Sequence, residues 1–412
     1  MTDLETRTAP PGAPSLRRAA PALLGYAAVR ALGLLALALW SAARDKNAYT
    51  LLTARWDSLW YTRVAEQGYG YEVRLPNGDV HSNLAFFPLL PWLERLSAAV
   101  TPLSYADGGF VVALLSSLAA AWGIFAVTDH LYGRRAGVCA VLLWAVLPVG
   151  IVQSMAYSES LFTALAAWSL YAVVTGRWVT AGILALLAGL TRPVGLAVVA
   201  AVWAAAIVAF VRERGTAGDP SSGRDRSPAR PDGAPFEERA RGTHRATGTR
   251  RALGMLLAPL GAAAYVLWVG HRTGHGPLGY LDVQAGWRNG FDGGQAFARF
   301  VADKFTSFPS ALAGVGLIVG VGLIVWLYVV CVRQRQPLPL LVYAGVVTAL
   351  ALCASSYFGS KPRLLMPAFP LLLPLALALA RLRTPRSALV LGTVAVGSAV
   401  YGAFWLNGSG PP

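Results

Sequence analysis

Charged residues are scarce in this sequence. Lys, Arg, Asp and Glu together make up 13% of the 412 residues, whereas 55% are hydrophobic. A soluble globular domain carries about 25% charged residues. The apolar residues form repeated runs long enough to span a bilayer, and in lipid such runs satisfy their backbone hydrogen bonds by forming helices. The sequence therefore predicts an all-α polytopic membrane protein and shows no soluble domain.

Cysteine and cofactor motifs are equally scarce. The three cysteines, Cys139, Cys331 and Cys353, fall in apolar runs without CxxC spacing, which is typical of small packing residues and not of a disulfide framework or a metal site. The five histidines form no HExxH-like pattern, and there is no P-loop and no GxGxxG motif before a helix. We therefore expect no metal, no cofactor and no nucleotide site on the cytoplasmic side.

Negative charge is short relative to positive charge, with 20 acidic against 35 basic residues and a net charge of +15. We expect no nucleic-acid binding from this excess, because much of it lies in loops, where arginine sets the orientation of a membrane protein. The pattern predicts a cytoplasmic N-terminus and an extracytoplasmic first long loop. The cytoplasmic positive charges are then Arg17, Arg18, Arg134, Arg135, Arg177, the block 212–251, Arg333, Arg335, Arg381, Arg383 and Arg386.

Hydropathy predicts about eleven transmembrane helices, within a range of ten to twelve. They lie near residues 21–42, 109–131, 136–155, 159–175, 178–190, 193–211, 252–271, 309–332, 338–356, 364–381 and 387–406. The run at 178–190 is short for a span of about 20 residues. Because Thr191-Arg192-Pro193 separates it from the next run, we expect a broken or partial helix there.

Four parts follow from these spans. Residues 1–20 are expected to be a disordered cytoplasmic tail, followed by an N-terminal membrane part at 21–211 whose outer loop, 43–108, is the candidate catalytic loop. Residues 212–251 are rich in Gly, Pro, Ser and Arg and predict a disordered basic cytoplasmic loop. Residues 252–412 form the C-terminal membrane part. No internal repeat is evident, which weakens the case for an inverted-repeat transporter.

The stretch RWDSLWYTRVAEQGYG, residues 55–70, is the candidate centre of function. At helical spacing one face gathers Thr53, Trp56, Asp57, Trp60, Tyr61 and Val64. A carboxylate on this aromatic face, beside a membrane, is costly unless something uses or pairs it. Two explanations fit Asp57. It is a catalytic carboxylate with Arg55, Trp56, Trp60 and Tyr61 as substrate-binding neighbours, or it forms a structural ion pair with Arg55 or a distant arginine.

The rest of this loop predicts a platform on the outer membrane face. GYGYEVRLPNGDVHSN is rich in turn residues, and LAFFPLLPWLERL at 84–96 is apolar but only about a dozen residues long. Such a segment suits a helix that lies in the interface or re-enters the membrane, and is too short for a span.

Two further positions carry charge at the outer ends of apolar runs. Glu159, in AYSESLF, begins a helix, where the helix dipole alone explains a carboxylate, although it could also orient a sugar hydroxyl. Arg192, in LTRPVG, could extend its side chain to the interface or hold a phosphate with its multi-donor guanidinium.

A basic pair and an aromatic loop complete the candidates. Lys361 and Arg363, in GSKPRLLMPAFP, lie on the outer side against the positive-inside trend, and phosphate anchoring would explain that placement. The loop at 272–308 contains QAGWRNGFDGG, with Trp287, Arg288 and Asp292. Its aromatic, amide and charged side chains together are typical of a sugar-facing surface, or of a turn-rich loop with an interfacial Trp.

Five of these motifs, in this order, carry a resemblance to a known family. They are RWDSLWY, NLAFFPLLPWL, AYSESLF, LTRPVG and GSKPRLLMPAFP, between about residues 50 and 370. The set resembles the PIG-V family, the second mannosyltransferase of GPI-anchor synthesis and its bacterial relatives, which are membrane glycosyltransferases of the GT-C type. The resemblance implies a GT-C-like bundle whose first outer loop forms interfacial helices.

The same resemblance implies transfer of mannose from a polyprenyl-phosphate mannose, with inversion at the anomeric carbon. By motif, Asp57 would be the general base, Glu159 an acidic residue close to the substrate, and Arg192 and Arg363 would face the phosphate. The family's arginine segment is often followed by a small polar residue and Asn. Here Pro193 and Val194 follow, which leaves the detailed role of Arg192 open.

The acceptor and the sugar are less defined. A composition rich in Ala, Arg and Leu but poor in Lys favours a bacterial relative. A bacterium makes no GPI anchor, so the acceptor would be a lipid glycan, a wall polymer or a protein, with membrane lipids as the other partners. Another hexose or a pentofuranose on a lipid donor also fits. A different class of function, a lipid or solute transporter or flippase, would place charges deep within several spans, whereas here they cluster at outer ends.

Overall fold

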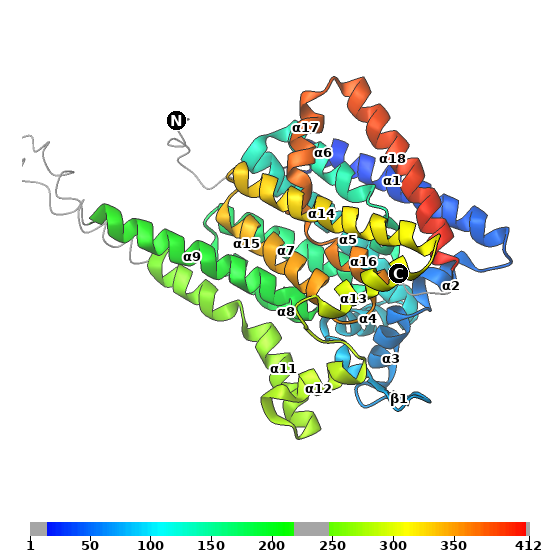
Figure 1. Cartoon of the computed structure of the whole chain (residues 1–412). Helices are drawn as coiled ribbons and strands as arrows, with labels where there is room; N and C mark the ends of the chain where they lie inside the picture. Colours follow the sequence, from blue (N-terminus) through cyan, green and yellow to red (C-terminus); the bar gives the residue numbers. More distant parts are fainter. Residues whose placement is uncertain (1–14, 218–246, 409–412) are drawn as a thin grey trace, which may run out of the picture.

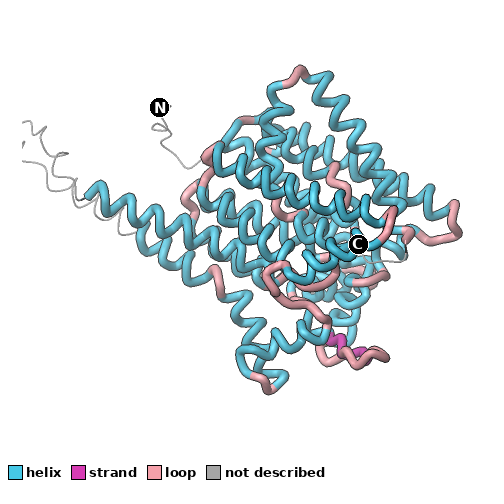
Figure 2. The backbone as a smooth tube through the Cα atoms, in the orientation of Figure 1, coloured by secondary structure: helices cyan, strands magenta, loops and turns pink. Residues whose placement is uncertain are grey.

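The structure is a computed structural model that describes residues 15–217 and 247–408. Within them almost every element is a helix, and one small hairpin is the exception (Figure 2). The expected all-α polytopic class is therefore confirmed. The helices of more than eight residues are α1 Leu16–Ala42, α3 Asp57–Gln67, α4 Leu89–Val100, α5 Tyr105–Tyr132, α6 Arg134–Ala145, α7 Ser158–Val174, α8 Trp178–Gly189, α9 Leu196–Ala217, α11 Leu260–Thr273, α13 Gln295–Asp303, α14 Ser310–Arg333, α15 Leu338–Cys353, α17 Leu373–Arg381 and α18 Thr384–Leu406.

Short elements connect these helices. They are α2 Ala48–Thr53, β1 Glu72–Arg74, β2 Val80–Ser82, η1 Asn83–Ala85, η2 Gly150–Ser154, η3 Pro193–Gly195, η5 Gly276–Leu278, α12 Gly279–Gly286, η6 Lys304–Thr306, η7 Phe358–Ser360, α16 Lys361–Leu365 and η8 Phe369–Leu372. The two strands pair antiparallel, with Glu72 opposite Ser82.

The expected count of eleven spans is not confirmed. Among the described residues, six helical segments are long and apolar enough to cross a membrane, namely Leu16–Ala42, Tyr105–Tyr132, Pro193–Arg214, Thr247–Thr273, Ser310–Arg333 and Thr384–Leu406. A seventh span is possible if Phe358–Leu365 and Phe369–Arg381, which are bent by 76°, cross together. Helices α7, α8 and α15 are apolar but shorter. Several predicted runs are thus helices too short for a full span, and the run at 136–155 joins α6 to η2 across a helix break.

The helices form one bundle whose neighbours are often distant in sequence. Helix α5 packs against α6 and α7, α1 packs against α18, and α9 packs against α15, beside which α14 runs (Figure 1). The close approach of α8 and α11 requires Gly261, because a Cβ there would lie 1.9 Å from the carbonyl oxygen of Leu186. Small residues at such crossings let helix backbones approach closely. This matters in membranes, where the hydrophobic effect contributes little to helix–helix association.

The loop at 43–108, which the sequence predicts to be extracytoplasmic, folds into α2, α3, the hairpin, η1 and α4. The helix expected within 84–96 begins at Leu89 and continues to Val100. Helix α11 holds this loop from the second half of the chain, because the hydroxyl of Tyr265 donates to the carbonyls of Leu84 and Phe86 at 2.9 and 2.7 Å. Helices α3, α11 and α12 and strand β1 accordingly lie at the same end of the molecule (Figure 1).

Helices extend into both of the segments that were expected to be disordered. Helix α1 begins at Leu16 and not after residue 20, because Ser15 caps it by accepting from the Arg18 backbone NH. Helix α9 extends to Ala217, and the chain is again helical from Thr247. An ion pair of 2.6 Å between Glu213 and Arg251 joins these two ends. The remainder of the predicted tail and loop, residues 1–14 and 218–246, lies outside the described residues.

One arginine is buried within the bundle and closes a break between helices. Arg30 of α1 donates to the carbonyls of Ala145 and Gly150, where α6 has ended and η2 begins. The neighbouring ring of Tyr26 stacks on Trp144 with centroids 5.5 Å apart. The guanidinium thus supplies donors to carbonyls that a broken helix leaves without an intrahelical partner.

The Arg30→Met variant should destabilise the protein in detergent by about 2 kcal/mol or more. Methionine keeps an unbranched chain but leaves two buried carbonyls unpaired, and each costs about 1–3 kcal/mol. Thermal unfolding followed by fluorescence measures the change. Arg17→Met, at an exposed position of the same helix, is the matched control. Equal melting temperatures for the Arg30 variant and its control would contradict the role of Arg30.

Candidate active site

Helix α3 begins at Asp57 because the chain breaks just before it. The continuous helical face expected from Thr53 to Val64 is wrong, since α2 ends at Thr53 and Trp56 adopts φ 53° and ψ −123°. A bulky residue rarely adopts positive φ, and such a conformation costs of order 1–3 kcal/mol. The guanidinium of Arg55 lies over the Trp56 ring, 4.0 Å from its centroid. Asp57 is consequently in the first turn of α3, at the positive end of the helix dipole.

Asp57 belongs to a cluster of two carboxylates and two arginines. Arg363 donates from Nη1 to Oδ2 of Asp57 at 2.8 Å, and its Nε lies 3.3 Å from Oε1 of Glu159. The same Glu159 oxygen forms an ion pair with Arg192. The side chain of Glu159 is 1% exposed and that of Asp57 is 28% exposed. The formal charges cancel, and Asp57 is the carboxylate that faces open space.

Local sequence explains how Glu159 and Arg192 reach the cluster. Glu159 lies in the first turn of α7, and the preceding Ser158 is hydrogen-bonded to the hydroxyl of Tyr61 of α3 at 2.7 Å. Helix α8 ends at Gly189, and Arg192 is extended, with φ −163° and ψ 155°. Proline disfavours helical geometry in the residue before it, so Pro193 explains both the helix break and this extended backbone.

A polar cavity of about 180 Å³ lies over this cluster. Of the residues predicted for the site, Asp57, Tyr61, Arg192 and Arg363 line it. Glu159 is not among the lining residues, because the two arginines separate it from the cavity. Trp60 packs beside the cavity, where the centroid of its ring lies 4.9 Å from that of Trp287. Arg55 and Trp56 are not among the lining residues.

Lys361 has a different environment from the one expected. Its ammonium donates to the carbonyls of Ala351, Leu352 and Ala354 at 2.8–3.2 Å, at the end of α15. It also lies 4.7 Å from the ring centroid of Phe297. These contacts fix the end of a helix and leave Lys361 away from the polar cavity, so its predicted phosphate contact is not part of this geometry.

The end of α12 and the loop after it complete the wall of the polar cavity. Gln284, Trp287 and Asn289 line this cavity. The motif QAGWRNGFDGG named Trp287 directly, and it included the two amides only as part of a sugar-facing pattern. The other two residues singled out from this loop have structural contacts. Arg288 forms an ion pair of 2.6 Å with Asp79, and Asp292 accepts from the backbone NH groups of Gly294 and Ala296 at the start of α13.

Trp287 is fixed from two sides by the hairpin. Its indole NH donates to the Ser82 carbonyl at 3.0 Å, and the ring of His81 stacks on it with centroids 4.0 Å apart. Burial lowers the pKa of His81 from its usual value of 6.5, against the opposing effect of Asp79. The imidazole is therefore neutral at neutral pH and packs on the indole as an uncharged ring.

An apolar cavity of about 330 Å³ adjoins the polar one. Both cavities are lined by Arg192, Pro193, Gln284, Asn289 and Leu364. Beyond these shared residues, the apolar cavity is bounded mainly by α15 side chains and by Phe291. The two cavities together can hold a molecule that is polar at one end and apolar at the other.

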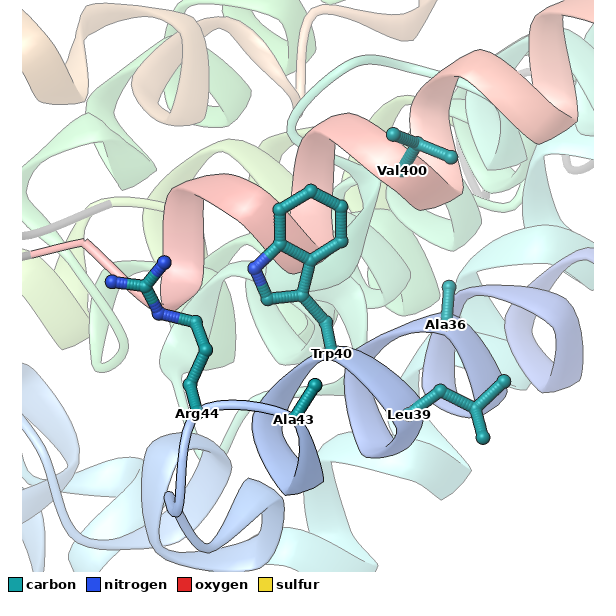
Figure 3. Close-up of a pocket in the computed structure, with 6 residues that line it drawn as sticks. All are labelled: Ala36, Leu39, Trp40, Ala43, Arg44 and Val400. Carbon is teal, nitrogen blue, oxygen red and sulfur yellow. The ribbon is translucent and has the colours of Figure 1, made fainter.

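A separate hollow of about 500 Å³ lies between α1 and α18 (Figure 3). Its lining residues are Ala36, Leu39, Trp40, Ala43, Arg44 and Val400. They include no carboxylate, so this hollow offers no general base. In residues 15–217 and 247–408, no three His, Cys, Asp or Glu side chains come together as metal ligands either.

Comparisons with known proteins match the first half of the membrane part. Residues 40–213 match the family model described as Mannosyltransferase (PIG-V). GPI alpha-1,6-mannosyltransferase 2 from Rattus norvegicus and that from Mus musculus are each 33% identical over 153 residues, which is 35% of this chain and 29% of theirs. The match thus spans less than a third of the length of these relatives.

Two solved structures of ArnT from Cupriavidus metallidurans are also similar. The structure bound to undecaprenyl phosphate has 14% identity and a TM-score of 0.49, covering 90% of this chain and 62% of that one. The apo structure has 16% identity and a TM-score of 0.46, covering 80% and 55%. The resemblance to the PIG-V mannosyltransferases expected from the motifs is confirmed over residues 40–213, which contain Asp57, Glu159 and Arg192.

Proposed function

We propose that this protein is a membrane glycosyltransferase that moves mannose from a polyprenyl-phosphate mannose to an extracytoplasmic acceptor hydroxyl, with inversion and with Asp57 as the general base. One observation carries the proposal. A carboxylate that faces open space shares a polar cavity with two arginines, and that cavity adjoins an apolar one.

The paired cavities fit a lipid-linked donor. A sugar phosphodiester on a polyprenyl chain needs cations at its phosphate and an apolar site for the first isoprene units. Arg192 lines both cavities and is the cation nearest to such a junction. Arginine suits this role because its planar guanidinium offers several donors to phosphate oxygens.

Asp57 would accept the proton of the acceptor hydroxyl. As the acceptor oxygen forms its bond to the anomeric carbon, the bond between that carbon and the phosphate oxygen breaks, and its electron pair leaves with the phosphate. The hydroxyl proton passes to the carboxylate of Asp57. Attack on the face opposite the phosphate inverts the anomeric carbon. A base within hydrogen-bond reach of the nucleophile contributes typically 10²–10⁴-fold in rate.

Arg363 would exchange partners when the donor enters. In the free protein it is shared between Asp57 and Glu159. A donor phosphate in the polar cavity competes with Asp57 for the same guanidinium, and losing that contact frees a carboxylate oxygen to accept a hydrogen bond from the acceptor hydroxyl. During transfer the phosphate gains one negative charge while Asp57 gains one proton, so the net charge of the site stays constant. Glu159, which contacts both arginines, would act as a positioning residue.

The Asp57→Asn variant should lose sugar transfer by about 10²–10⁴-fold. The amide keeps the size of the side chain but cannot accept the proton. Transfer is measured in membranes with radiolabelled polyprenyl-phosphate mannose, beside the wild type. Asp45→Asn, an exposed position in the same loop, is the control. If the folded Asp57 variant transfers normally, Asp57 is structural and Glu159 is the next carboxylate to test. If the wild type transfers no mannose, the proposed donor is wrong.

The Arg363→Ala variant should weaken binding of polyprenyl phosphate by about 10- to 100-fold, since hydrogen bonds to charged groups contribute about 1.5–3 kcal/mol. Direct binding in detergent measures the change, and Arg363→Lys should restore part of the affinity. Arg299→Ala removes an exposed arginine of α13 and should bind normally. Wild-type affinity in a folded Arg363→Ala protein would refute the phosphate contact.

A further inference from the structure

Two amide side chains at the junction of the cavities are held in a fixed orientation. The Nδ2 of Asn289 donates to Oε1 of Gln284 at 2.8 Å, and the Nε2 of Gln284 donates to the hydroxyl of Tyr280 at 2.5 Å. Tyr280 is buried and lies 3.4 Å from the carbonyl oxygen of Ala85, to which it donates. The carbonyl of Ala85 can only accept, so each hydrogen bond in this series has a fixed direction. The series therefore determines which end of each amide is the oxygen.

The backbone of this loop is equally constrained. The NH of Asn289 donates to the carbonyl of Gln284 at 2.9 Å. The backbone NH of Gly290 donates to the hydroxyl of Ser355 at 2.9 Å, and the backbone NH of Ser355 donates to the carbonyl of Gly290 at 2.9 Å. Phe291 pairs with Ala354 as an isolated β-bridge. Asn289 therefore stands on a loop tied to the end of α15 and Gln284 on the last turn of α12, so both have the fixed support that a preorganised recognition surface requires.

Their position between the cavities defines what they can meet. Both amides line the apolar cavity and the polar cavity, as Arg192 does, whereas Asp57, Trp287 and Arg363 line the polar cavity alone. In the proposed complex the lipid chain occupies the apolar cavity, and Asp57, the proposed base, lies in the polar cavity. The part of the donor at the junction between the two cavities is then its phosphate or the sugar that the phosphate carries. Within the described residues, the carboxamide oxygen of Asn289 accepts no hydrogen bond.

Amides suit a sugar better than they suit a phosphate or an isoprene chain. A hydroxyl both donates and accepts, and a carboxamide offers both functions without charge. A phosphate only accepts hydrogen bonds, and the arginines donate to it. The isoprene chain neither donates nor accepts hydrogen bonds. The hydroxyl of Ser356, which also lines the polar cavity, is buried without a partner and adds another neutral group.

We propose that Asn289 and Gln284 recognise the hydroxyls of the donor sugar and select which lipid-linked hexose is used. The proposal rests on the proposed function and extends it to sugar specificity. Neutral groups built to hydrogen-bond a substrate hydroxyl discriminate strongly, because an analogue with the hydroxyl misplaced leaves them unpaired.

The test compares binding of polyprenyl phosphate with binding of its mannosyl and glucosyl forms. The Asn289→Ala variant should bind polyprenyl-phosphate mannose about tenfold more weakly and should lose most of the preference between the two sugars. Its affinity for polyprenyl phosphate without a sugar should equal that of the wild type. Asn289→Asp, which keeps the shape and the acceptor oxygen but cannot donate to Gln284, should show an intermediate loss.

Gln295→Ala removes an exposed amide six residues along the chain and should change none of these affinities. If Asn289→Ala weakens all three lipids equally, Asn289 contacts the phosphate or shapes the cavity, and the proposal is overturned. Unchanged affinity for the mannosyl lipid also overturns it, and a change confined to the acceptor KM would assign the amides to the acceptor. A wild-type protein that binds none of the lipids would instead refute the proposed donor class.

Discussion

The site depends on the sharing of two arginines between two carboxylates. Glu159 is almost fully buried and would be costly there as an unpaired ion. Arg192 and Arg363 both contact it, and Arg363 also reaches Asp57. These contacts join α3, α7, the α8–η3 break and α16. The same ion pairs therefore determine both how this end of the bundle is arranged and the electrostatics of the polar cavity. A phosphate that engages the arginines would change both.

The sequence predicted which elements would matter better than it predicted their geometry. Asp57 was identified by its position on an aromatic face, but the helix break at Trp56 was missed, because positive φ is a signal read from Gly or Asn and not from Trp. Glu159 and Arg192 were identified as charges at span ends. Their pairing, and that of Asp57 with a residue 306 positions away, depends on tertiary packing that no local pattern reports.

The remaining misses have similar physical causes. Lys361 looked like half of a basic pair, yet its ammonium serves the carbonyls at the end of α15. Gln284 and Asn289 belong to the QAGWRNGFDGG motif, whose amides contributed to the expected sugar-facing pattern, but neither residue was singled out, because amides in such a segment are ordinary. The count of eleven spans is not confirmed, because α7, α8 and α15 are apolar helices shorter than a full span and a bend of 76° divides the segment around residue 366.

The position of Arg363 has a consequence for how the protein is made. Residues 40–213, which match the PIG-V family, include Asp57, Glu159 and Arg192, but the cation of Asp57 arrives with α16, 306 residues after the carboxylate that it pairs. By then Gln284 and Asn289 have already been made. Until α16 docks, a nascent chain holds a carboxylate without its counter-ion. Docking of α16 is therefore the step that turns a membrane-inserted bundle into a completed site, and truncations before residue 363 cannot contain it.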